Sequence, residues 1–364
     1  MISKTDKGSL TRQKKALFVS SIPWSENNRG LLSVVDKLGS KYKVLIAARS
    51  IDFEQLRTPD LRIYDLSFSI SNRYIRWLMT SNFTFIPFGF FIYICYKHRP
   101  DVIYLRESRF YISVVFLRLF FRKMKFFLDI RENPETHYPE SVFFLKYFNK
   151  SVDEVRTISK ELKGHLEAKF NFKNVTFKYS LPTQKFLDSI AFPNKKNNTI
   201  LKICFFGDIK FDRLVHILVE AVNLSPYEVD CDIYGKIVKE SYKEYLDTLN
   251  INSSVRFMGE INYEDAPKIL THYDCGFLMN EVNNNSKFTI PGKLWEYTSC
   301  GLCVISDKRA SVYKFVREYD IGMICSDVKS VVNCIEQFSK DRKSLFNCKK
   351  NSIDFFNHIS RLQS

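Results

Sequence analysis

Several features that would place this sequence in a simple class are missing from it. Residues 1–15 are polar and basic and contain no apolar core followed by small residues, so they do not predict a secretory signal, and we expect residues 1–13 to form a basic tail. The chain shows no internal repeat and no low-complexity tract. Its 45% apolar and 15% aromatic content is too high for a disordered protein. We therefore expect a folded chain.

Cysteine patterns typical of metal or disulfide sites are also lacking. Most of the nine cysteines lie inside apolar runs, where small buried thiols are common. Cys300 and Cys303 have the spacing of a redox motif, but they flank Gly301 at an expected helix-to-strand turn, and no second pair completes a zinc site. We interpret the cysteines as reduced and structural, which favours a cytoplasmic location and no protein-bound metal.

The chain has little negative charge relative to its positive charge. Its 55 Lys and Arg against 40 Asp and Glu give a formal net charge of +15. Such an excess indicates an anionic partner, which can be a phospholipid surface, a nucleic acid or a phosphate-bearing substrate. No known nucleic-acid recognition module is present, so nucleic-acid binding would rest on charge alone, and we expect none.

Two segments of the first half suggest a membrane surface. Residues 77–96 contain no charged side chain and have the length that spans a bilayer, but polar residues such as Asn82 favour a helix or loop that touches the membrane instead. Residues 109–127 mix aromatic side chains with Arg118, Arg122, Lys123 and Lys125, which suits an interfacial element near anionic lipid. The alternative for the second segment is a buried helix that runs into a strand through a basic turn.

Short apolar runs separated by helix-length stretches predict strands buried on both faces. The first series is 16–21, 43–48, 61–66, 101–105, 125–130, 154–159 and 175–179, and the second is 200–208, 231–235, 255–259, 274–280, 302–307 and 321–327. The pattern predicts an α/β fold with two Rossmann-like parallel-sheet domains, whose ligands bind beyond the carboxyl ends of the strands in a cleft. We expect domains at 14–181 and 200–345, a polar linker at 182–199, and a C-terminal helix at 346–364 that can cross back to the first domain.

The most informative segment begins at Thr289. Pro291 fits a first helical turn, Gly301 fits a C-terminal cap, and a buried strand follows. The N-terminus of this helix suits a diphosphate, because its N–H groups and dipole attract anions. Lys293 and Glu296 share one helix face, so the lysine can bind phosphate while the carboxylate accepts hydrogen bonds from ribose hydroxyls. The alternative is a surface salt bridge on an ordinary helix.

The pattern Pro291-x-Lys293-x-x-Glu296-Tyr297-x-x-x-Gly301 resembles the donor-site motif of glycosyltransferase family 4, in the branch that begins Pro-x-Lys. The resemblance implies a GT-B fold with a central cleft and a nucleotide-sugar donor, and it places Pro291, Gly292, Lys293 and Glu296 at that donor. Glu296 corresponds to the family's ribose-binding glutamate. Phe288 stands where the wider family has another glutamate, which contacts the transferred sugar.

A second match, from Phe206 to Arg213, resembles the family's phosphate-binding loop. Arg213 falls on the position of a phosphate-binding lysine, and Asp208 falls on the position of an arginine. The missing contact can come from Lys210 or Lys293. The resemblance thus adds Gly207, Lys210 and Arg213 to the donor site, and it extends over most of residues 14–330, most strongly in the second domain.

On the acceptor side, Arg131 and Glu132 follow an expected strand, and His137 lies on the next loop. Each is a candidate to orient the acceptor hydroxyl, because a catalytic base must lie within hydrogen-bond distance of the proton that it takes. The alternative is that these residues only pair with each other or with the loop.

The resemblance implies a retaining enzyme that works without a metal ion or other cofactor, in which cations and helix N-termini stabilise the leaving diphosphate. No Asp-x-Asp motif stands at a cleft-facing position. We expect transfer to a saccharide or lipid-linked saccharide in surface polysaccharide or glycoconjugate synthesis, on the inner face of the plasma membrane. The alternatives are a nucleotide-sugar epimerase or hydrolase of the same fold and a basic nucleic-acid-binding protein.

Overall fold

The computed structural model describes residues 14–23, 38–49, 62–65, 85–106, 111–193, 199–249 and 251–363. The chain forms two compact units, of which unit 1 is Met1–Arg156 with Leu166–Thr176 and unit 2 is Thr157–His165 with Phe177–Ser364. The expected basic tail at 1–13 lies outside the described residues. The domain limits expected from the sequence stay predictions.

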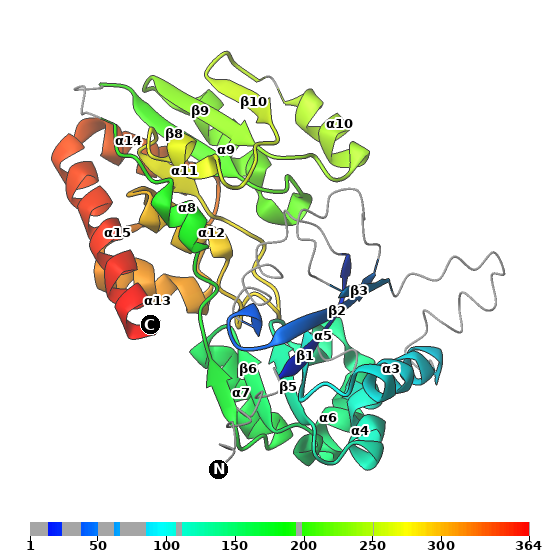
Figure 1. The fold of residues 1–364 in the computed structure, drawn as a ribbon. Coiled ribbons are helices and arrows are strands. Elements are labelled where there is room, and N and C mark those ends of the chain that lie inside the picture. Colours follow the sequence, from blue (N-terminus) through cyan, green and yellow to red (C-terminus); the bar gives the residue numbers. More distant parts are fainter. Residues whose placement is uncertain are drawn as a thin grey trace, which may run out of the picture. The chain divides into compact units, whose positions relative to one another are not determined.

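The first sheet has seven strands in the order β3-β2-β1-β4-β5-β6-β7 (Figure 1). They are β1 (Lys15–Pro23), β2 (Lys43–Arg49), β3 (Arg62–Asp65), β4 (Val102–Arg106), β5 (Lys125–Ile130), β6 (Glu154–Thr157) and β7 (Val175–Phe177). The helices along this part of the chain are α3 (Phe85–His98), α4 (Tyr111–Phe120), α5 (Pro134–His137), η3 (Pro139–Ser141), α6 (Val142–Tyr147), η4 (Asn149–Ser151) and α7 (Lys160–Phe170). β1 pairs in parallel with β2 and β4, so the strand order reverses at β1.

The sheet of unit 2 has six strands in the order β10-β9-β8-β11-β12-β13. They are β8 (Leu201–Phe206), β9 (Val229–Tyr234), β10 (Val255–Gly259), β11 (Cys275–Phe277), β12 (Cys303–Ser306) and β13 (Gly322–Ile324). The helices of this part are α8 (Gln184–Asp188), η5 (Phe211–Arg213), α9 (Val215–Leu224), α10 (Glu240–Thr248), α11 (Ala266–Leu270), α12 (Gly292–Ser299), α13 (Ala310–Tyr319), α14 (Val328–Lys340) and α15 (Arg342–Gln363). The order reverses between β8 and β11, which is where sheets of this kind bind ligands.

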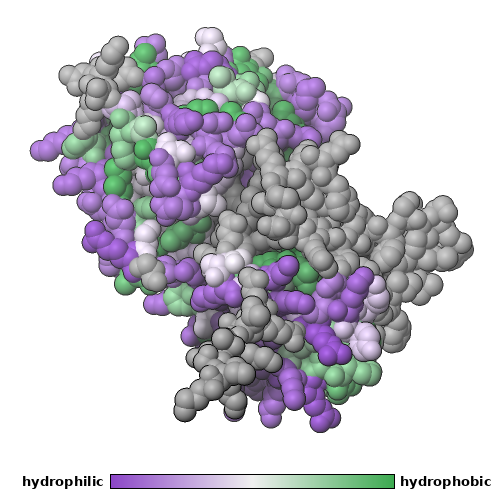
Figure 2. Space-filling model, in the orientation of Figure 1, coloured by the Kyte–Doolittle hydropathy of each residue, from purple (hydrophilic) through white to green (hydrophobic). Residues whose placement is uncertain are grey.

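Helices cover both faces of the middle of the unit 2 sheet, which explains the apolar run at 203–206 in β8. Ile203 and Phe205 of β8 pack in a core cluster with α9 and α14. Cys204 and Phe206 point to the other face, where they pack with α12 and α15. Since successive strand residues point to opposite faces, this arrangement requires a continuous apolar run. The described side chains on the face drawn in Figure 2 are mostly hydrophilic, as expected when the apolar ones fill the core.

All strands predicted from the apolar runs are present, most of them with shifted ends. The largest differences are at β11, which was expected at 274–280 and ends at Phe277, and at β13, which was expected at 321–327 and ends at Ile324. Leu278 still donates its N–H to Ile305, but Asn280 donates to the Asp307 side chain instead of a strand carbonyl. The α/β fold with two parallel sheets is therefore confirmed, while the end of β11 is set by side-chain contacts.

The segments proposed to touch a membrane are partly described. Residues 77–84 lie outside the described residues, and 85–96 belong to α3. Residues 111–120 form α4, and a turn leads from it into β5. Within the ranges that the structure describes, no helix is long and apolar enough to cross a membrane.

The expected linker and C-terminal helix both contain ordered elements of unit 2. α8 lies inside the 182–199 segment and buries Phe186, whereas residues 194–198 lie outside the described ranges. α15 begins before residue 346 and packs against α12, α13 and α14 (Figure 1). Its Gln363 accepts from the Lys178 ammonium at 2.7 Å and from the Tyr179 N–H at 2.8 Å.

All nine cysteines are buried free thiols. Burial raises the pKa of Cys300 to about 12, and the same effect raises the pKa of Cys95 to about 12. The expectation of structural thiols is therefore confirmed, and Cys300 and Cys303 form no disulfide.

Candidate functional site

The last residues that β8 and β11 pair are Cys204 and Gly276, and the Tyr297 hydroxyl of α12 contacts the backbone of both strands just beyond them. This hydroxyl accepts the N–H of Phe206 at 2.9 Å and lies 3.4 Å from the carbonyl oxygen of Phe277. A Cβ at Gly276 would lie 2.3 Å from the Tyr297 ring, so only glycine fits there. Tyr297 thereby bonds backbone groups at the ends of two diverging strands and fixes α12 at the switch point.

The loop after β8 begins with Gly207, whose φ of 127° favours glycine. Lys210 forms an ion pair with Asp208 at 2.9 Å, so the acidic residue at the family's arginine position is engaged by a neighbouring lysine. The short helix η5 follows and ends at Arg213, and the next residue, Leu214, has a φ of 53°. This left-handed residue lets α9 begin directly after it, at Val215.

Tyr242 of α10 supports both sides of the turn that carries Arg213. Its ring centroid lies 4.2 Å from that of Phe211, and its hydroxyl accepts the N–H of His216 at 3.1 Å. The Nδ1 atom of His216 lies 3.0 Å from the same hydroxyl. Burial lowers the pKa of His216, which favours the neutral imidazole at the start of α9. Arg213 is therefore the cation of this turn.

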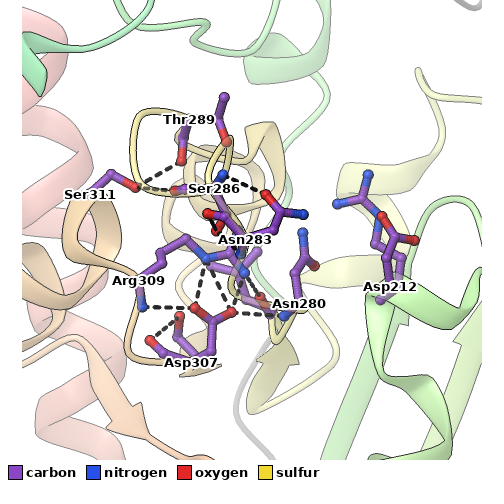
Figure 3. Close-up of polar contacts among 11 residues, drawn as sticks. Asp212, Asn280, Asn283, Ser286, Thr289, Asp307, Arg309 and Ser311 are labelled. Carbon is purple, nitrogen blue, oxygen red and sulfur yellow. Dashed lines mark hydrogen bonds and ion pairs between the residues drawn. The ribbon is translucent and has the colours of Figure 1, made fainter. Parts of the chain in front are cut away.

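Asn280, directly after β11, links Arg213 to the end of β12. The Asn280 side-chain amide is assigned with its oxygen toward Arg213. In this orientation the oxygen accepts from the guanidinium at 2.5 Å, and the amide nitrogen donates to the Met279 carbonyl at 2.7 Å. The Asn280 N–H donates to the Asp307 carboxylate at 2.7 Å. Figure 3 shows Asn280 between Asp307 and the turn that carries Asp212.

A buried ion pair anchors this edge of the sheet. Asp307 and Arg309 are 3% and 1% exposed, and the Arg309 Nε lies 2.8 Å from the Asp307 carboxylate. Arg309 also donates to the Leu278 carbonyl at 3.1 Å. A buried pair of this kind does not by itself stabilise a fold, but loss of one partner leaves an uncompensated buried charge. Its bonds here fix the ends of β11 and β12 relative to each other.

Side-chain hydrogen bonds shape the loop between β11 and α12 (Figure 3). The Asn283 Oδ1 accepts the N–H groups of Asn285 and Ser286, both at 2.9 Å. Ser311 of α13 donates to the Thr289 carbonyl at 2.8 Å. The loop therefore enters α12 along a defined path.

The start of α12 brings the Lys293 ammonium to the loop after β8, and Glu296 lies one turn further along the helix. The Lys293 ammonium lies 3.6 Å from the centroid of the Phe205 ring, and a Cβ at Gly207 would lie 2.8 Å from Lys293 Cε. Glu296 is 2% exposed, and its Oε1 lies 3.4 Å from the place of a Cβ on Gly292. Both side chains thus lie beside the helix N-terminus, which attracts anions. The alternative of a surface salt bridge does not fit a buried Glu296.

Phe288 offers no polar side chain to this site. Its ring lies 4.6 Å from that of His165, and its carbonyl accepts from the Ser159 hydroxyl at 2.5 Å. Pro291 is the N-cap of α12 and lies just before its first turn. Gly301 has a φ of 72° after the helix, as the expected C-terminal cap requires.

The Asp-x-Asp sequence of this chain, Asp230-Cys231-Asp232, lies within β9. Arg256 of β10 donates to Asp232 at 2.7 Å and to Asp230 at 3.2 Å. The Tyr273 hydroxyl donates to Asp232 at 2.5 Å. Both carboxylates are thus engaged with a neighbouring strand.

In unit 1, the three acceptor-side candidates follow β5. The Arg131 Nε lies 3.0 Å from the carboxylate of Asp129, which is 1% exposed. The Glu132 carboxylate contacts the His137 Nε2 atom, and the Thr136 hydroxyl lies 3.3 Å from the other ring nitrogen of His137. The sequence analysis gave pairing of the candidates with each other as the alternative to a role at the acceptor, and Glu132 and His137 do contact each other. Both side chains are also partly accessible to solvent.

The donor-side candidates fall into two groups that the fold brings together, because Gly207, Lys210 and Arg213 follow β8 while Pro291, Gly292, Lys293 and Glu296 begin α12. The close approach of Lys293 to Gly207 joins the groups. Sequence reasoning missed Asn280, Asp307 and Tyr242. The signal for the first two was a polar residue directly after a buried run, whereas nothing marked Tyr242 as a support.

The sequence profile described as glycosyl transferases group 1 matches residues 188–355, which include every donor-side candidate. No curated protein sequence matches the chain. The fold is nevertheless similar to that of many solved structures.

Sucrose-phosphate synthase from Thermosynechococcus elongatus has a TM-score of 0.75 and 13% identity, with 95% of each chain covered. HepE of Anabaena in complex with UDP has a TM-score of 0.74 and 12% identity, with 96% of this chain and 97% of that chain covered. A glycosyltransferase from Rickettsia africae has a TM-score of 0.71 and 12% identity, with 95% and 94% covered. These likenesses extend over both units and confirm the GT-B fold.

Proposed function

We propose that this chain is a glycosyltransferase that moves a sugar from a nucleotide-sugar donor to a saccharide or lipid-linked saccharide, because its residues 188–355 match the profile described as glycosyl transferases group 1. We further propose retention of the anomeric configuration and a place in surface polysaccharide or glycoconjugate synthesis. The observation that carries the donor assignment is Lys293 lying against Gly207 beside the buried Glu296.

In the proposed reaction, the bond between the anomeric carbon and the diphosphate oxygen breaks as the acceptor oxygen bonds to the same face of that carbon. Arg213, Lys293 and the N-terminus of α12 stabilise the negative charge that develops on the diphosphate. The diphosphate oxygen accepts the proton of the acceptor hydroxyl. Glu296 accepts hydrogen bonds from the ribose, and Arg131, Glu132 and His137 orient the acceptor.

UDP is the first donor probe, because HepE of Anabaena was solved with UDP and with UDP-glucose. Lys293→Ala and Glu296→Ala should each weaken UDP binding about 10- to 100-fold, since a hydrogen bond to a charged group contributes about 1.5–3 kcal/mol. Calorimetric titration measures the effect. Lys268→Ala is the matched control, because Lys268 forms an exposed pair with Asp265 at 3.0 Å in the same unit. Wild-type UDP affinity in both site variants would reject the donor site.

We propose that catalysis needs no metal ion, since fixed cations neutralise the diphosphate. Activity should therefore survive EDTA, and Arg213→Ala should lower turnover more than it weakens donor binding. Reaction rates measured with and without chelator test the prediction for EDTA. The turnover of Arg213→Ala, compared with its affinity for UDP, tests the prediction for Arg213. A strict requirement for manganese or magnesium would reject the first one, and unchanged turnover would remove Arg213 from the site. Detection of a transferred sugar, rather than an epimerised or hydrolysed donor, identifies the reaction.

We also propose that unit 1 docks on the inner face of the plasma membrane through α3, α4 and α6. α4 packs against both other helices, and none of the three contains Asp or Glu. Each helix exposes large apolar side chains, namely Tyr93 and Tyr96 on α3, Phe116, Leu119 and Phe120 on α4, and Phe143 and Tyr147 on α6. The nearby exposed cations are Lys97, Arg122, Lys123 and Lys146. This combination suits an anionic lipid surface.

Vesicle sedimentation tests the docking face. The protein should bind vesicles that contain phosphatidylglycerol more tightly than pure phosphatidylcholine vesicles, and salt should weaken the binding. Leu119→Ser with Phe120→Ser should reduce binding to both. Leu224→Ser with Phe346→Ser is the control, because these exposed apolar residues belong to unit 2. Equal binding of both double variants would reject this face.

A further inference from the structure

Arg213 lies on η5, in the turn after β8, and its side chain has to be held in place if it is to meet a diphosphate at a fixed position. An arginine side chain that is bound to nothing samples many rotamers, and ordering it when a ligand binds costs free energy. Asp212 does little to hold it, because its carboxylate lies 3.9 Å from the Arg213 Nε and its side chain is 48% exposed. The position of this cation therefore depends on a partner from another part of unit 2.

Asn280, which follows β11, is such a partner. In the orientation assigned from its hydrogen bonds, its side-chain oxygen accepts from the Arg213 guanidinium at 2.5 Å, and its amide nitrogen donates to the Met279 carbonyl at 2.7 Å. The amide group is thus bonded on both sides. Because the bond to the backbone fixes the amide, its oxygen offers the guanidinium one place instead of several.

The backbone joins the same two segments a second time. The Glu281 N–H donates to the Asp212 carbonyl at 2.9 Å, so the residues adjacent to Asn280 and Arg213 are bonded to each other as well. All four residues belong to unit 2, so the contacts are defined within one compact body. The separation between the amide and the guanidinium is therefore set by the backbone and does not rest on the side-chain bond alone.

A buried layer holds Asn280 in turn (Figure 3). The Asn280 N–H donates to the Asp307 carboxylate at 2.7 Å, and the Arg309 N–H donates to the same carboxylate at 2.9 Å. Arg309 also donates to the carbonyl of Leu278, two residues before Asn280, at 3.1 Å. The carboxylate and the guanidinium of this layer compensate each other, so the layer fixes the backbone at Asn280 without adding net charge.

The chemical identity of residue 280 matters as much as its place. An amide oxygen accepts a hydrogen bond from a guanidinium but carries no net charge. A carboxylate in the same place would neutralise Arg213, and it would also stand beside the Asp307 carboxylate, which is an unfavourable like-charge contact. Asparagine therefore fixes the guanidinium and leaves its positive charge for an anion.

We propose that Asn280 is a positioning residue, which holds the Arg213 guanidinium at the diphosphate of the donor without neutralising it. A cation that is held in advance does not have to reorient when negative charge develops on the leaving group, and such preorganised charge is a large part of catalysis. This inference rests on the proposed function. It extends the donor site from residues that touch the nucleotide to one that acts through Arg213.

NMR of the arginine side chains tests the positioning without any ligand. The Nε–H signal of Arg213, assigned by its loss in Arg213→Lys, should show a restrained side chain in the wild type and a mobile one in Asn280→Ala, with a lower heteronuclear NOE. Asn280→Asp keeps an acceptor oxygen and should leave the side chain restrained. Asn351→Ala is the matched control, because Asn351 donates to the Asp320 carbonyl at 3.2 Å elsewhere in unit 2.

The backbone amide spectrum of the same samples shows whether each variant is folded. An Arg213 side chain that is equally mobile in the wild type and in Asn280→Ala would overturn the proposal. This result is obtained whether or not UDP binds, so it does not depend on the identity of the nucleotide.

Calorimetry with UDP and uridine connects the position of Arg213 to the diphosphate. Uridine lacks the diphosphate, so the ratio of the two affinities isolates the contribution of that group. Asn280→Ala, which releases the cation, and Asn280→Asp, which neutralises it, should each lower the ratio about three- to tenfold, and Asn351→Ala should leave it unchanged. In the Arg213→Ala background, Asn280→Ala should cause no further loss, because it acts through the guanidinium.

Two outcomes of the titrations count against the positioning role. If Arg213→Ala lowers the ratio and both Asn280 variants leave it unchanged, or if the losses of Arg213→Ala and Asn280→Ala add in the double variant, the proposal is overturned. A ratio that Arg213→Ala itself leaves unchanged would instead reject the proposed donor chemistry at Arg213, and the NMR signal would still decide whether Asn280 holds the guanidinium.

Discussion

At the scale of single residues, Gly207 and Lys293 constrain each other. The backbone of Gly207 has a φ of 127°, and the Lys293 side chain lies where a Cβ would project. A lysine held against a strand end keeps its ammonium near the helix N-terminus with little loss of rotamer entropy on binding. The position of the cation therefore depends on the absence of a side chain at residue 207.

Gly207→Ala should lower both stability and donor affinity. The positive φ alone costs about 1–3 kcal/mol for a residue with a Cβ, and displacement of Lys293 should weaken UDP binding about tenfold. Urea unfolding and UDP titration measure the two effects. Gly164→Ala is the matched control, because nothing lies within 4 Å of a Cβ there and Gly164 is helical. That control should be neutral or slightly stabilising. If Gly207→Ala bound UDP like the wild type, Lys293 would not act through this contact.

Some site residues could be predicted from spacing, and others could not. Lys293 and Glu296 are one helical turn apart beside a recognisable N-terminus, so local sequence places them on one face. Asp307 and Asn280 are 27 positions apart, and their bond exists because β11 and β12 are neighbours in the sheet. No local pattern encodes that contact. Likewise, the pairing of Asp208 with Lys210 needed side-chain positions rather than the family pattern.

At the scale of elements, α14 has a complete N-terminal capping box. The Asp327 carboxylate accepts the N–H of Ser330 at 2.8 Å, and the Ser330 hydroxyl accepts the N–H of Asp327 at 3.0 Å. The hydrogen bonds that the carboxylate accepts from Ser330 and Ser326 lower the pKa of Asp327. α14 packs against α9 and α15, so its start helps to hold one layer of unit 2 in place.

Asp327→Ala should lower the free energy of unfolding at pH 7, because the start of α14 loses its cap. The folded-state pKa of Asp327 lies below the unfolded value, so its ionic contribution is present above the ordinary Asp pKa of about 3.9 and disappears as the pH falls through the folded-state value. The difference in the free energy of unfolding between wild type and Asp327→Ala should thus become smaller as the pH falls. Asp327→Asn keeps a capping oxygen without charge and should lose less. A gap that is constant from pH 7 to acid would reject the ionic contribution.

Element order was largely predictable from sequence, whereas element ends were not. Apolar runs identify strands because parallel strands are buried on both faces, and this held for both sheets. The apolar run at 274–280 continues past β11, yet the strand ends at Phe277, where Tyr297 bonds the Phe277 carbonyl and the Asn280 N–H turns to the Asp307 side chain. Leu278 and Met279 are still buried beyond the end of β11, so hydropathy could not reveal where the strand ends.

At the scale of the whole molecule, each unit has its own sheet and buried interior, and the proposed donor site lies entirely in unit 2. A ligand that binds one folded unit stabilises that unit by mass action. The thermal unfolding of this chain is therefore expected to respond unevenly to donor nucleotide.

Scanning calorimetry should resolve two unfolding transitions. UDP should raise the midpoint temperature of only the transition that belongs to unit 2. At 100 times its dissociation constant, a ligand adds about 2.7 kcal/mol to the stability of the state that binds it. Lys293→Ala should abolish the shift without moving the transition of unit 1. A single transition that shifts as a whole with UDP would show that the units unfold together and would contradict this expectation.

The ring of Tyr297 leaves no room for a side chain at Gly276, and this has an evolutionary consequence. Neither position can be substituted alone. A larger residue at 276 would collide with the Tyr297 ring. A smaller residue at 297 would leave a void and remove the acceptor of the Phe206 N–H. Among homologous chains, the two positions should consequently covary. Lineages with a side chain at the first should have replaced the aromatic residue at the second, and chains that break the rule should have remodelled the gap between the two strands.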